Sequence, residues 1–417
     1  MTVQADRRRY IAVPEQLRVR LPGLEAALDV DTVAAVIERE LLGGRADTVI
    51  VGLSVGTIWV GEDTCSLRYR VRVRSPATGS NGEQVVLGQV SSSGLALRLF
   101  PHDPALSTLP QALDRATVRR TLAAVGLDPR NAQVTVVHHP RQGACVLRYD
   151  VDGSRLFAKV YGDDATGGSV AAVQSRLQNL SGSVRFPTVL AYDPNLRLLL
   201  MDAVPGIHLT QPAGVGAAGH ALAHLHGQDV AGAPTRTLSD DLADLDRALA
   251  VIGRFRPDVA DLIREGISEA DADASDAPAG VLTHGDYTPS QLLWDGTVVG
   301  VVDLDDMCVA DPARDLGRFI AAFALRASRQ IGMSYASVQV SELTASLVEA
   351  YLEARPLGQP DHTLLRRVAA YRALSLARSA ARSCRQLKED RLAAALTLLS
   401  VEADQATSAT PRLRRPT

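Results

Sequence analysis

Residues 284–305 read HGDYTPSQLLWDGTVVGVVDLD and place carboxylate and amide side chains close together in the sequence. Asp286 opens a turn-rich loop, Gln291 begins a short apolar run, and Asp303 ends the next apolar run, with Asp305 just beyond it. The runs QLLW and VVGVVD on either side of a DG turn predict a β-hairpin. Because this hairpin would bring Asp286, Gln291 and Asp303 to one end, the sequence predicts a cluster of oxygen ligands there.

Composition limits the classes of protein to which the chain can belong. Its 417 residues, 46% of them hydrophobic, are enough for two or three domains with cores of their own. A net charge of -3 gives no overall basic field, so we expect no nucleic-acid partner and no membrane partner. The oligomeric state is unknown from the sequence. The cysteines form no CxxC or CxxH unit, so we expect them to be reduced and buried: Cys65, Cys145, Cys308 and Cys384.

The two ends of the sequence bear on location. The first residues contain no apolar segment of the kind found in signal peptides, and no later run approaches the roughly 20 apolar residues that span a bilayer. We therefore expect a cytoplasmic protein. Residues 406–417 combine Pro, Ser and Arg without apolar periodicity, which predicts a disordered tail.

The first half of the chain contains an internal echo. CSLRYRV at 65–71 and CVLRYDV at 145–151 are nearly the same strand, and each is followed by a turn and another strand. A duplicated small β-sheet module accounts for this echo, and two unrelated edge strands remain the alternative. The second copy offers a cation, Lys159, where the first has Gln89. We expect the first copy to bind no ATP, to pack against the second sheet and to stiffen it.

A change from β-rich to helical sequence marks the middle of the chain. The apolar run LRLLLMDAVPG stops at Pro205 and Gly206, which suits a hinge between two lobes. Beyond it, helical periodicity predicts helices over 213–227, 239–255 and 257–270, the second capped by Ser239 and Asp240. A β-rich part followed by a mostly helical part is an α+β layout with two lobes.

The joint motif identifies a family. An HxD triplet with an amide five residues after its aspartate is the arrangement that protein kinases use for phosphoryl transfer. HGDxxxxQ, then VVDLDD, then DPARDLGRF resembles the aminoglycoside phosphotransferase family of antibiotic and small-molecule kinases, from about residue 130 into the C-terminal helices. The resemblance implies a two-lobed protein-kinase-like fold with an extra N-terminal β-rich cap domain. The domains we expect are a cap at 1–128, a kinase N-lobe at 129–206, a helical C-lobe with the catalytic loop at 207–405, and the tail at 406–417.

The resemblance also implies roles for individual residues. Asp286 would take the proton of the substrate hydroxyl, Gln291 and Asp303 would hold Mg²⁺, and Lys159 would pair with the α and β phosphates of ATP. The backbone of a hinge strand would meet adenine, and this strand is made of Met201, Asp202, Ala203 and Val204. Supporting roles would fall to His284, Asp305, Asp311 and Asp315.

Three departures from the family pattern have consequences. Most members have Asn where this chain has Gln291, and Gln is what maltokinase-like and glucosamine-kinase-like members show, together with an extra N-terminal domain. The loop before Lys159 has one glycine, so phosphate binding would use other backbone donors or Arg141. The helix expected to supply a glutamate for Lys159 contains no acid over 167–180. The candidate substitutes, between which the sequence does not choose, are Asp163, Asp164, Gln174 and Gln178.

These features predict an ATP- and Mg²⁺-dependent phosphotransferase that acts on a hydroxyl of a small molecule, namely a sugar, aminosugar or cyclitol. One alternative is a kinase that phosphorylates Ser or Thr of a peptide, and another is a non-catalytic scaffold. Arg378, Arg382 and Arg385 share one face of the C-terminal helix by their spacing, which by default indicates a solvated face. If that face lines the acceptor cleft, it would repel polycationic aminoglycosides and suit a neutral or anionic acceptor.

Overall fold

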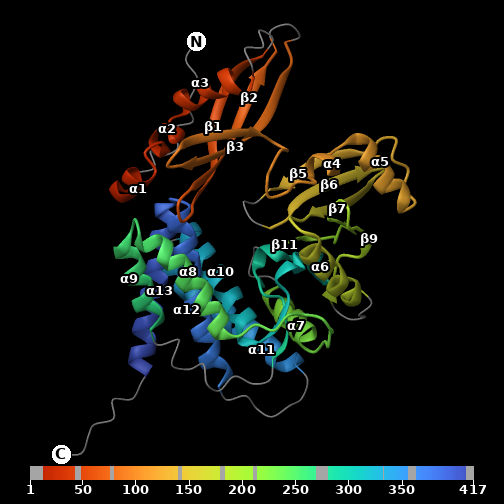
Figure 1. The fold of residues 1–417 in the computed structure, drawn as a ribbon. Helices are drawn as coiled ribbons and strands as arrows, with labels where there is room; N and C mark the ends of the chain where they lie inside the picture. Colours follow the sequence, from red (N-terminus) through yellow and green to blue (C-terminus); the bar gives the residue numbers. More distant parts are fainter. Residues whose placement is uncertain are drawn as a thin grey trace, which may run out of the picture.

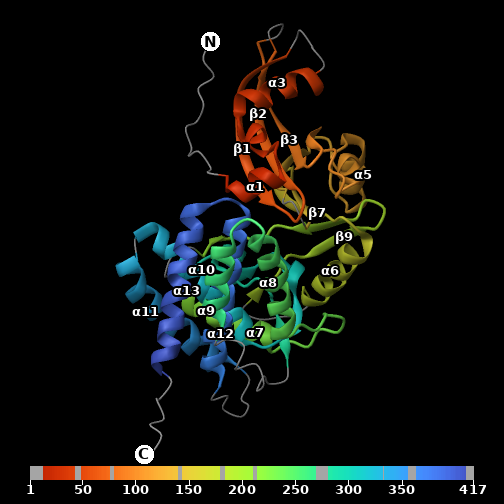
Figure 2. The same ribbon diagram turned by 60° about the vertical axis from the view of Figure 1, so that its left-hand side comes forward.

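The computed structural model describes residues 13–42, 48–75, 79–139, 143–178, 184–209, 214–268, 280–331, 333–355 and 363–409. Arg141, a candidate for phosphate binding, lies outside these residues. The described chain is mixed α and β, with an N-terminal sheet above a helical region and a second sheet beside it (Figure 1). The turned view keeps the N-terminal sheet above the same helices (Figure 2). The α+β class expected from the sequence is confirmed.

The N-terminal module begins with three helices and continues into a four-stranded antiparallel sheet. The helices are α1 (Glu15–Arg20), α2 (Leu24–Leu28) and α3 (Val30–Glu40). The strands follow chain order across the sheet: β1 (Val49–Val60), β2 (Cys65–Arg74), β3 (Asn81–Ser91) and β4 (Gly94–Leu99). Alternate side chains of β2 are buried, as expected for a sheet with one face against a core.

The second sheet has five strands in the order β5-β6-β7-β10-β9. Its strands are β5 (Gln133–His138), β6 (Cys145–Val151), β7 (Ser154–Val160), β9 (Val189–Asp193) and β10 (Leu198–Asp202). Two helices precede it, α4 (Leu109–Ala112) and α5 (Arg115–Ala124), and α6 (Asp164–Leu177) and β8 (Val184–Arg185) lie between β7 and β9 in the chain. Leu109 and Leu122 are fully buried in one core with Leu147 and Ala158 of the sheet.

The remaining chain is mainly helical, with short strands that carry the loops of interest. The helices are α7 (Val215–His226), α8 (Leu238–Gly253), α9 (Pro257–Ile267), α10 (Ala313–Ile331), α11 (Met333–Ala354), α12 (Leu364–Arg385) and α13 (Glu389–Ala409). The strands are β11 (Ile207–His208), β12 (Val281–Thr283), β13 (Leu292–Trp294), β14 (Val299–Val301) and β15 (Cys308–Ala310). Within the described part of the chain, none of the helices combines the length and apolar character that crossing a membrane requires.

The two sheets share their strand register. Cys65 faces Val90 in the first sheet, and Cys145 faces Val160 in the second. One step further along, Gln89 pairs with Ser66 where Lys159 pairs with Val146. The neutral glutamine and the ammonium group therefore occupy equivalent positions in the two sheets.

The helices that precede each sheet match as well. The hydroxyl of Tyr69 donates to the carbonyl oxygen of Ala27 at 2.7 Å, and that of Tyr149 donates to the carbonyl oxygen of Ala112 at 3.4 Å. Each following helix is capped by an aspartate whose carboxylate accepts the N–H of a threonine three residues on: Asp29 with Thr32, and Asp114 with Thr117. A duplicated module would give such features, and the shared origin of the two modules stays a prediction.

Some boundaries of domains and helices differ from those predicted from the sequence. Because α4 and α5 pack onto the second sheet, we propose that the N-terminal module ends near residue 100 and not near 128. The side-chain cap of α8 is Thr237, not Ser239, and Asp240 completes a capping box from inside the helix. Helix α13 continues to Ala409, past residue 405, where we placed the end of the helical region. The expected burial of the four cysteines is seen.

The N-terminal module packs on the helical region. Its buried residues belong to one hydrophobic core with those of α7 to α13, whereas the second sheet has a core of its own. At the turn between β1 and β2, Arg385 donates to the carbonyl oxygen of Val60 at 2.8 Å and lies 4.5 Å from the ring centre of Trp59. Arg254 adds ion pairs to Glu62 and Asp63. We expected the module to pack against the second sheet, and these contacts show that it also packs on the helical region.

The placement of α4 can be tested by truncating one core side chain. We expect Leu109→Ala to lower the free energy of unfolding by about 2–5 kcal/mol, because the side chain is fully buried against the second sheet. Leu365→Ala is the control, since that leucine is 61% exposed, and should change the free energy by less than about 0.5 kcal/mol. Urea unfolding measures both, and equal effects would mean that α4 is not part of this core.

Candidate active site

The loop that carries Asp286 is shaped by a glycine. Strand β12 pairs with β15 and leads directly into His284, Gly285 and Asp286. Gly285 has a φ of 83°, and a Cβ there would collide with the carbonyl oxygen of Asp306. Only glycine tolerates both the left-handed backbone and this close approach. The middle residue of HGD therefore sets the direction in which Asp286 leaves the strand.

Asp315 holds this loop from below. Its side chain is fully buried and accepts the backbone N–H groups of His284 at 2.7 Å and Gly285 at 2.9 Å. His226 lies 3.2 Å from the same carboxylate, and its other ring nitrogen is 3.0 Å from the hydroxyl of Tyr351. Burial opposes ionisation, but the hydrogen bond and charge of His226 keep the pKa of Asp315 below its usual range. Asp315 thus supports the loop directly, as expected. His226, which we had not assigned to the site, in turn contacts Asp315.

The other supporting residues differ in what they contact. His284 lies with its Nε2 atom 3.0 Å from the carbonyl oxygen of Val302, which is the contact of a structural histidine. Asp311 accepts the N–H of Ala313 and a guanidinium N–H of Arg367 at 2.6 Å. We expected Asp311 to hold the catalytic loop, whereas these contacts fix the start of α10 to α12.

The hairpin brings three of the predicted residues together. Strands β13 and β14 pair, and the carboxylate of Asp295 accepts two backbone N–H groups in the turn between them. At the other end, the amide nitrogen of Gln291 donates to Asp303 at 3.0 Å and to Asp286 at 3.4 Å. Asp286, Gln291 and Asp303 therefore meet at one end of the hairpin.

Asp303 leaves its strand in an unusual backbone conformation. Its φ of 65° is in the left-handed region, which costs a residue with a side chain on the order of 1–3 kcal/mol. Such a conformation persists only where surrounding contacts determine it, and here Gln291 and Lys159 both hold the carboxylate. The strained backbone turns Asp303 toward the second sheet.

Lys159 connects the second sheet to this cluster. Its Nζ atom donates to Asp303 at 2.6 Å and to Asp305 at 2.7 Å, and the hydroxyl of Tyr161 donates to Asp305 at 3.1 Å. Only 9% of the Lys159 side chain is exposed. Burial would lower the pKa of Lys159, but the charges of Asp305 and Asp303 raise it, so the ammonium form is retained.

This pairing answers the question of what replaces the missing glutamate. None of the four substitutes that we considered contacts Lys159 in the described structure. Asp163 caps α6, Asp164 accepts the hydroxyl of Tyr192, Gln174 donates to the carbonyl oxygen of Pro187, and Gln178 accepts the N–H of Val189. The partners of Lys159 come from the other lobe.

Arg318 is a site residue that the sequence reasoning missed. It lies on α10, and both its Nε atom, at 2.7 Å, and a terminal nitrogen donate to the same oxygen of Asp286. The signal was present, because Arg318 is the arginine of DLGRF in the motif that identified the family. It fixes one oxygen of Asp286 and leaves the other near Gln291.

The predicted hinge residues connect the lobes. Met201 and Asp202 end β10, and Asp202 exchanges hydrogen bonds with Thr188 through its backbone N–H and its carboxylate. Ala203 and Val204 follow the strand, and Val204 lies against Gly300 of β14. The segment therefore runs from the second sheet to the hairpin, and its contact with adenine stays a prediction.

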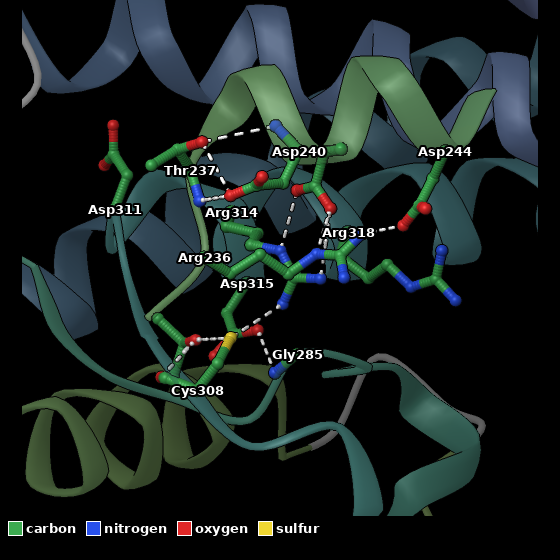
Figure 3. Close-up of polar contacts among 12 residues, drawn as sticks. Arg236, Thr237, Asp240, Asp244, Gly285, Cys308, Asp311, Arg314, Asp315 and Arg318 are labelled. Atoms are coloured by element: carbon green, nitrogen blue, oxygen red, sulfur yellow. Dashed lines mark hydrogen bonds and ion pairs between the residues drawn. The ribbon is translucent and has the colours of Figure 1, made fainter. Parts of the chain in front are cut away.

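A buried aspartate organises the arginines beside the loop. The Asp241 side chain is 1% exposed and accepts N–H groups of Arg314 at 2.9 Å, Arg236 at 2.7 Å and Arg378 at 2.9 Å. Figure 3 shows Arg236 and Arg314 between α8 and the loop at Gly285. Burial opposes ionisation of Asp241, but the arginines, Arg314 first, keep its pKa low.

A cavity of about 460 Å³ lies beside Asp286, with Gly285, Asp306 and Arg318 in its lining. Asp306 keeps contact with solvent, yet surrounding protein and the charges of Asp286 and Asp305 raise its pKa. This end of the cavity therefore concentrates negative charge, which a cation would relieve.

The metal donors expected from the sequence are one carboxylate, Asp303, and one amide, Gln291. No group of three or more His, Cys, Asp or Glu side chains in the described ranges is arranged to hold a metal ion. The carboxylate of Asp303 and the amide of Gln291 are donors of the type that hard Mg²⁺ prefers, with room for phosphate and water oxygens. The amide nitrogen of Gln291 faces Asp303, so the amide must turn over to offer its oxygen.

Comparison with known proteins places the chain. Residues 134–371 match the phosphotransferase enzyme family, abbreviated APH. Because this match spans more than half of the sequence and includes the HGD loop, the hairpin and Lys159, the chain belongs to the phosphotransferase enzyme family. This confirms the resemblance found in the sequence. The match begins in β5, so it leaves out the N-terminal module.

Solved structures with a similar fold include kinases of small molecules. A choline kinase from Cryptosporidium parvum is 13% identical with a TM-score of 0.50 over 66% of this chain and 90% of that one. A choline/ethanolamine kinase family protein from Mesorhizobium loti is 20% identical with a TM-score of 0.49 over 73% and 96%. A macrolide 2′-phosphotransferase from Brachybacterium faecium is 17% identical with a TM-score of 0.44 over 74% and 100%. Identities this low speak for the fold alone. The search of curated proteins found no match.

The role of Asp315 predicts how stability depends on pH. The pKa of Asp315 is lowered in the folded state. Its ionised carboxylate therefore stabilises the fold fully at pH values above the pKa of an unfolded aspartate, about 3.9, and this stabilisation is lost as the pH falls through the folded pKa. Asp315→Asn removes this dependence, and at neutral pH it should cost about 1–3 kcal/mol because one of the two buried N–H groups loses its acceptor.

Urea unfolding of the wild type and the variant between pH 7 and pH 2 measures both effects. The wild type should lose more of its free energy of unfolding than Asp315→Asn over the acidic part of this range. Asp261→Asn, at a side chain that is 67% exposed, is the control and should follow the wild type. Parallel curves for Asp315→Asn and the wild type would show that Asp315 does not titrate as described.

Proposed function

We propose that this phosphotransferase moves the γ-phosphate of ATP to a hydroxyl of a small molecule, namely a sugar, aminosugar or cyclitol. The observation that carries the proposal is the meeting of Lys159 from the second sheet with Asp303 and Asp305, next to Asp286. Phosphoryl transfer needs little covalent chemistry from a protein. It needs a positioned hydroxyl and groups that balance the charge of the phosphates.

Asp286 is the residue that would accept the proton of the substrate hydroxyl. A carboxylate accepts the hydroxyl proton only if one oxygen stays free and correctly aimed. Arg318 holds one oxygen with two N–H groups, so the other can turn to the acceptor. The two charge-assisted N–H contacts from Arg318 also fix the orientation of the Asp286 carboxylate.

Lys159 and Asp303 are the residues for the nucleotide. When ATP binds, Lys159 can exchange its aspartates for phosphate oxygens. The carboxylates that it releases then need another cation, and Asp303 with Gln291 would hold Mg²⁺ there. The ion would neutralise charge on the β and γ phosphates. This exchange would give the buried, doubly paired Lys159 a role in binding the nucleotide.

The two alternative functions receive less support. A non-catalytic scaffold was suggested by the missing helix glutamate, but Lys159 has two carboxylate partners and Asp286 is held by Arg318. A peptide kinase needs a wide, open acceptor groove. The cavity beside Asp286 is about 460 Å³, which is within the range of small-molecule sites, roughly 300–1,000 Å³.

The base role predicts a specific kinetic effect. Asp286→Ala should lower turnover by a factor on the order of 10²–10⁴ because proton acceptance is lost, with little change in nucleotide affinity. A coupled assay for ADP release measures turnover, and calorimetry measures nucleotide binding. Asp261→Ala on the exposed face of α9 is the control and should keep full activity. Near-normal turnover of Asp286→Ala would remove Asp286 from the mechanism.

The metal role predicts a selective loss of affinity. Asp303→Asn keeps a residue type that tolerates the left-handed backbone and removes only the charge. It should weaken binding of ATP with Mg²⁺ far more than binding of adenosine, because only the phosphates communicate with the ion. Calorimetric titration of both ligands decides the question. Equal losses for the two ligands would indicate a disturbed lobe and not a lost metal ligand.

A further inference from the structure

The lining of the cavity beside Asp286 is rich in arginine. Of the described residues that line it, eight are arginines and two are acids, Asp244 and Asp306. Four of these arginines have acidic partners: Arg236, Arg314 and Arg378 contact Asp241, and Arg318 contacts Asp286. Arg385 contacts the N-terminal module, and the other arginines of the lining are the ones that concern a ligand.

Three of them form a cationic end, which we define as Arg329, Arg382 and Arg391. Within the described residues, no acid lies within ion-pair distance of any of the three side chains. Burial, followed by the charges of Arg391, Arg329 and Arg382, lowers the pKa of Lys388, so each of the three arginines lies close enough to Lys388 to repel it. Unbalanced positive charge in a cavity favours an anion there.

The cationic end is separated along the cavity from the end at Asp286, where the hydroxyl would react. Arg318, which holds Asp286, and Arg329 are both on α10 and both line the cavity. They are eleven residues apart, which corresponds to about 16 Å of helix rise. Because arginine side chains are long and can reach back along the cavity, a molecule of one or two sugar rings could contact both ends.

The N-terminal module contributes a side chain to the lining of the cavity. Trp59, from the end of β1, lines the cavity, and Arg385 lies over its ring at 4.5 Å. The same arginine donates to the carbonyl oxygen of Val60. An aromatic ring beside arginines suits a ligand with both a sugar-like ring and a charge. The module thus contributes a wall of the cavity, outside the part of the chain that matches the family.

We propose that the acceptor is an anionic hydroxy compound, a sugar or cyclitol that carries a phosphate group. The phosphate lies at Arg329, Arg382 and Arg391, and the reacting hydroxyl lies at Asp286. This assignment rests on the proposed kinase function. The hydroxyl oxygen bonds to the γ-phosphorus as the bond from that phosphorus to the bridging oxygen breaks. ADP leaves, and the hydroxyl proton goes to Asp286.

The test compares matched acceptors. Glucose and glucose 6-phosphate, glucosamine and glucosamine 6-phosphate, and inositol and inositol 1-phosphate are assayed for ADP release with the full chain. Glucuronate is included as a carboxylate. We expect a kcat/KM at least tenfold higher for a phosphorylated compound than for its neutral partner. A preference for the neutral compounds would overturn the proposal, and a preference for glucuronate would overturn the assignment of phosphate.

Variants locate the effect. Arg382→Gln should raise the KM of the phosphorylated acceptor about tenfold to hundredfold, since one charge-assisted contact is lost, and leave the KM of ATP unchanged. Arg382→Lys should recover part of the loss. The matched control is Arg366→Gln, an exposed position on the same helix outside the cavity, which should behave as the wild type. Equal KM values for Arg382→Gln and the control would overturn the assignment of the cationic end.

Binding measurements separate failure of this inference from failure of the proposed function. If no compound is phosphorylated, calorimetry is done with ATP and Mg²⁺, and separately with glucose 6-phosphate. Both proposals would be supported if the wild type binds ATP with Mg²⁺ and also glucose 6-phosphate, and if Arg382→Gln loses the binding of glucose 6-phosphate. If glucose 6-phosphate binds the wild type and Arg382→Gln equally, or binds neither of them, only the assignment of the cationic end is overturned. Absence of ATP binding would overturn the kinase function.

Discussion

The buried ammonium group of Lys159 is the constraint on which the arrangement of the site depends. An unpaired charge at this depth would cost several kcal/mol, and Lys159 avoids that cost by sharing its charge between Asp303 and Asp305. These carboxylates belong to the hairpin end in the other lobe. The pairing therefore fixes the two lobes relative to one another, and it explains why the backbone of Asp303 is held at a positive φ. Two hydrogen bonds of Gln291 connect Asp303 to Asp286, so the same pairing also sets the position of Asp286.

The sequence predicted the parts of the site that depend on local chemistry. The HGD loop, the DG turn and the apolar runs on either side of that turn are properties of adjacent residues, and they bring Asp286, Gln291 and Asp303 together as expected. The partners of Lys159 could not be read in this way, because Asp303 is 144 residues away in the chain. Arg318 was hidden for a related reason: its motif was visible, but the face of α10 that meets Asp286 depends on how the helices pack.

For the N-terminal module as well, the sequence predicted the features that depend on neighbouring residues and not those that depend on packing between distant residues. Its strand register followed from the repeated CxLRYxV sequence. The earlier boundary that we propose was not visible in the sequence, because α4 is very short and the segment before α5 has the composition of a linker. Only the packing of Leu109 and Leu122 on the second sheet shows where these helices belong. The docking of Trp59 and Val60 on Arg385 was also beyond the sequence, since it joins residues 325 positions apart.

The dependence of ATP binding on Mg²⁺ tests the central claim most directly, because Lys159 must leave two carboxylates when it meets the phosphates. Calorimetric titration of the full chain with ATP, in excess Mg²⁺ and then in excess chelator, is the measurement. We predict tight binding with Mg²⁺ and a large loss of affinity in chelator, since no other cation then balances Asp303 and Asp305. Equal affinity under the two conditions would contradict the account.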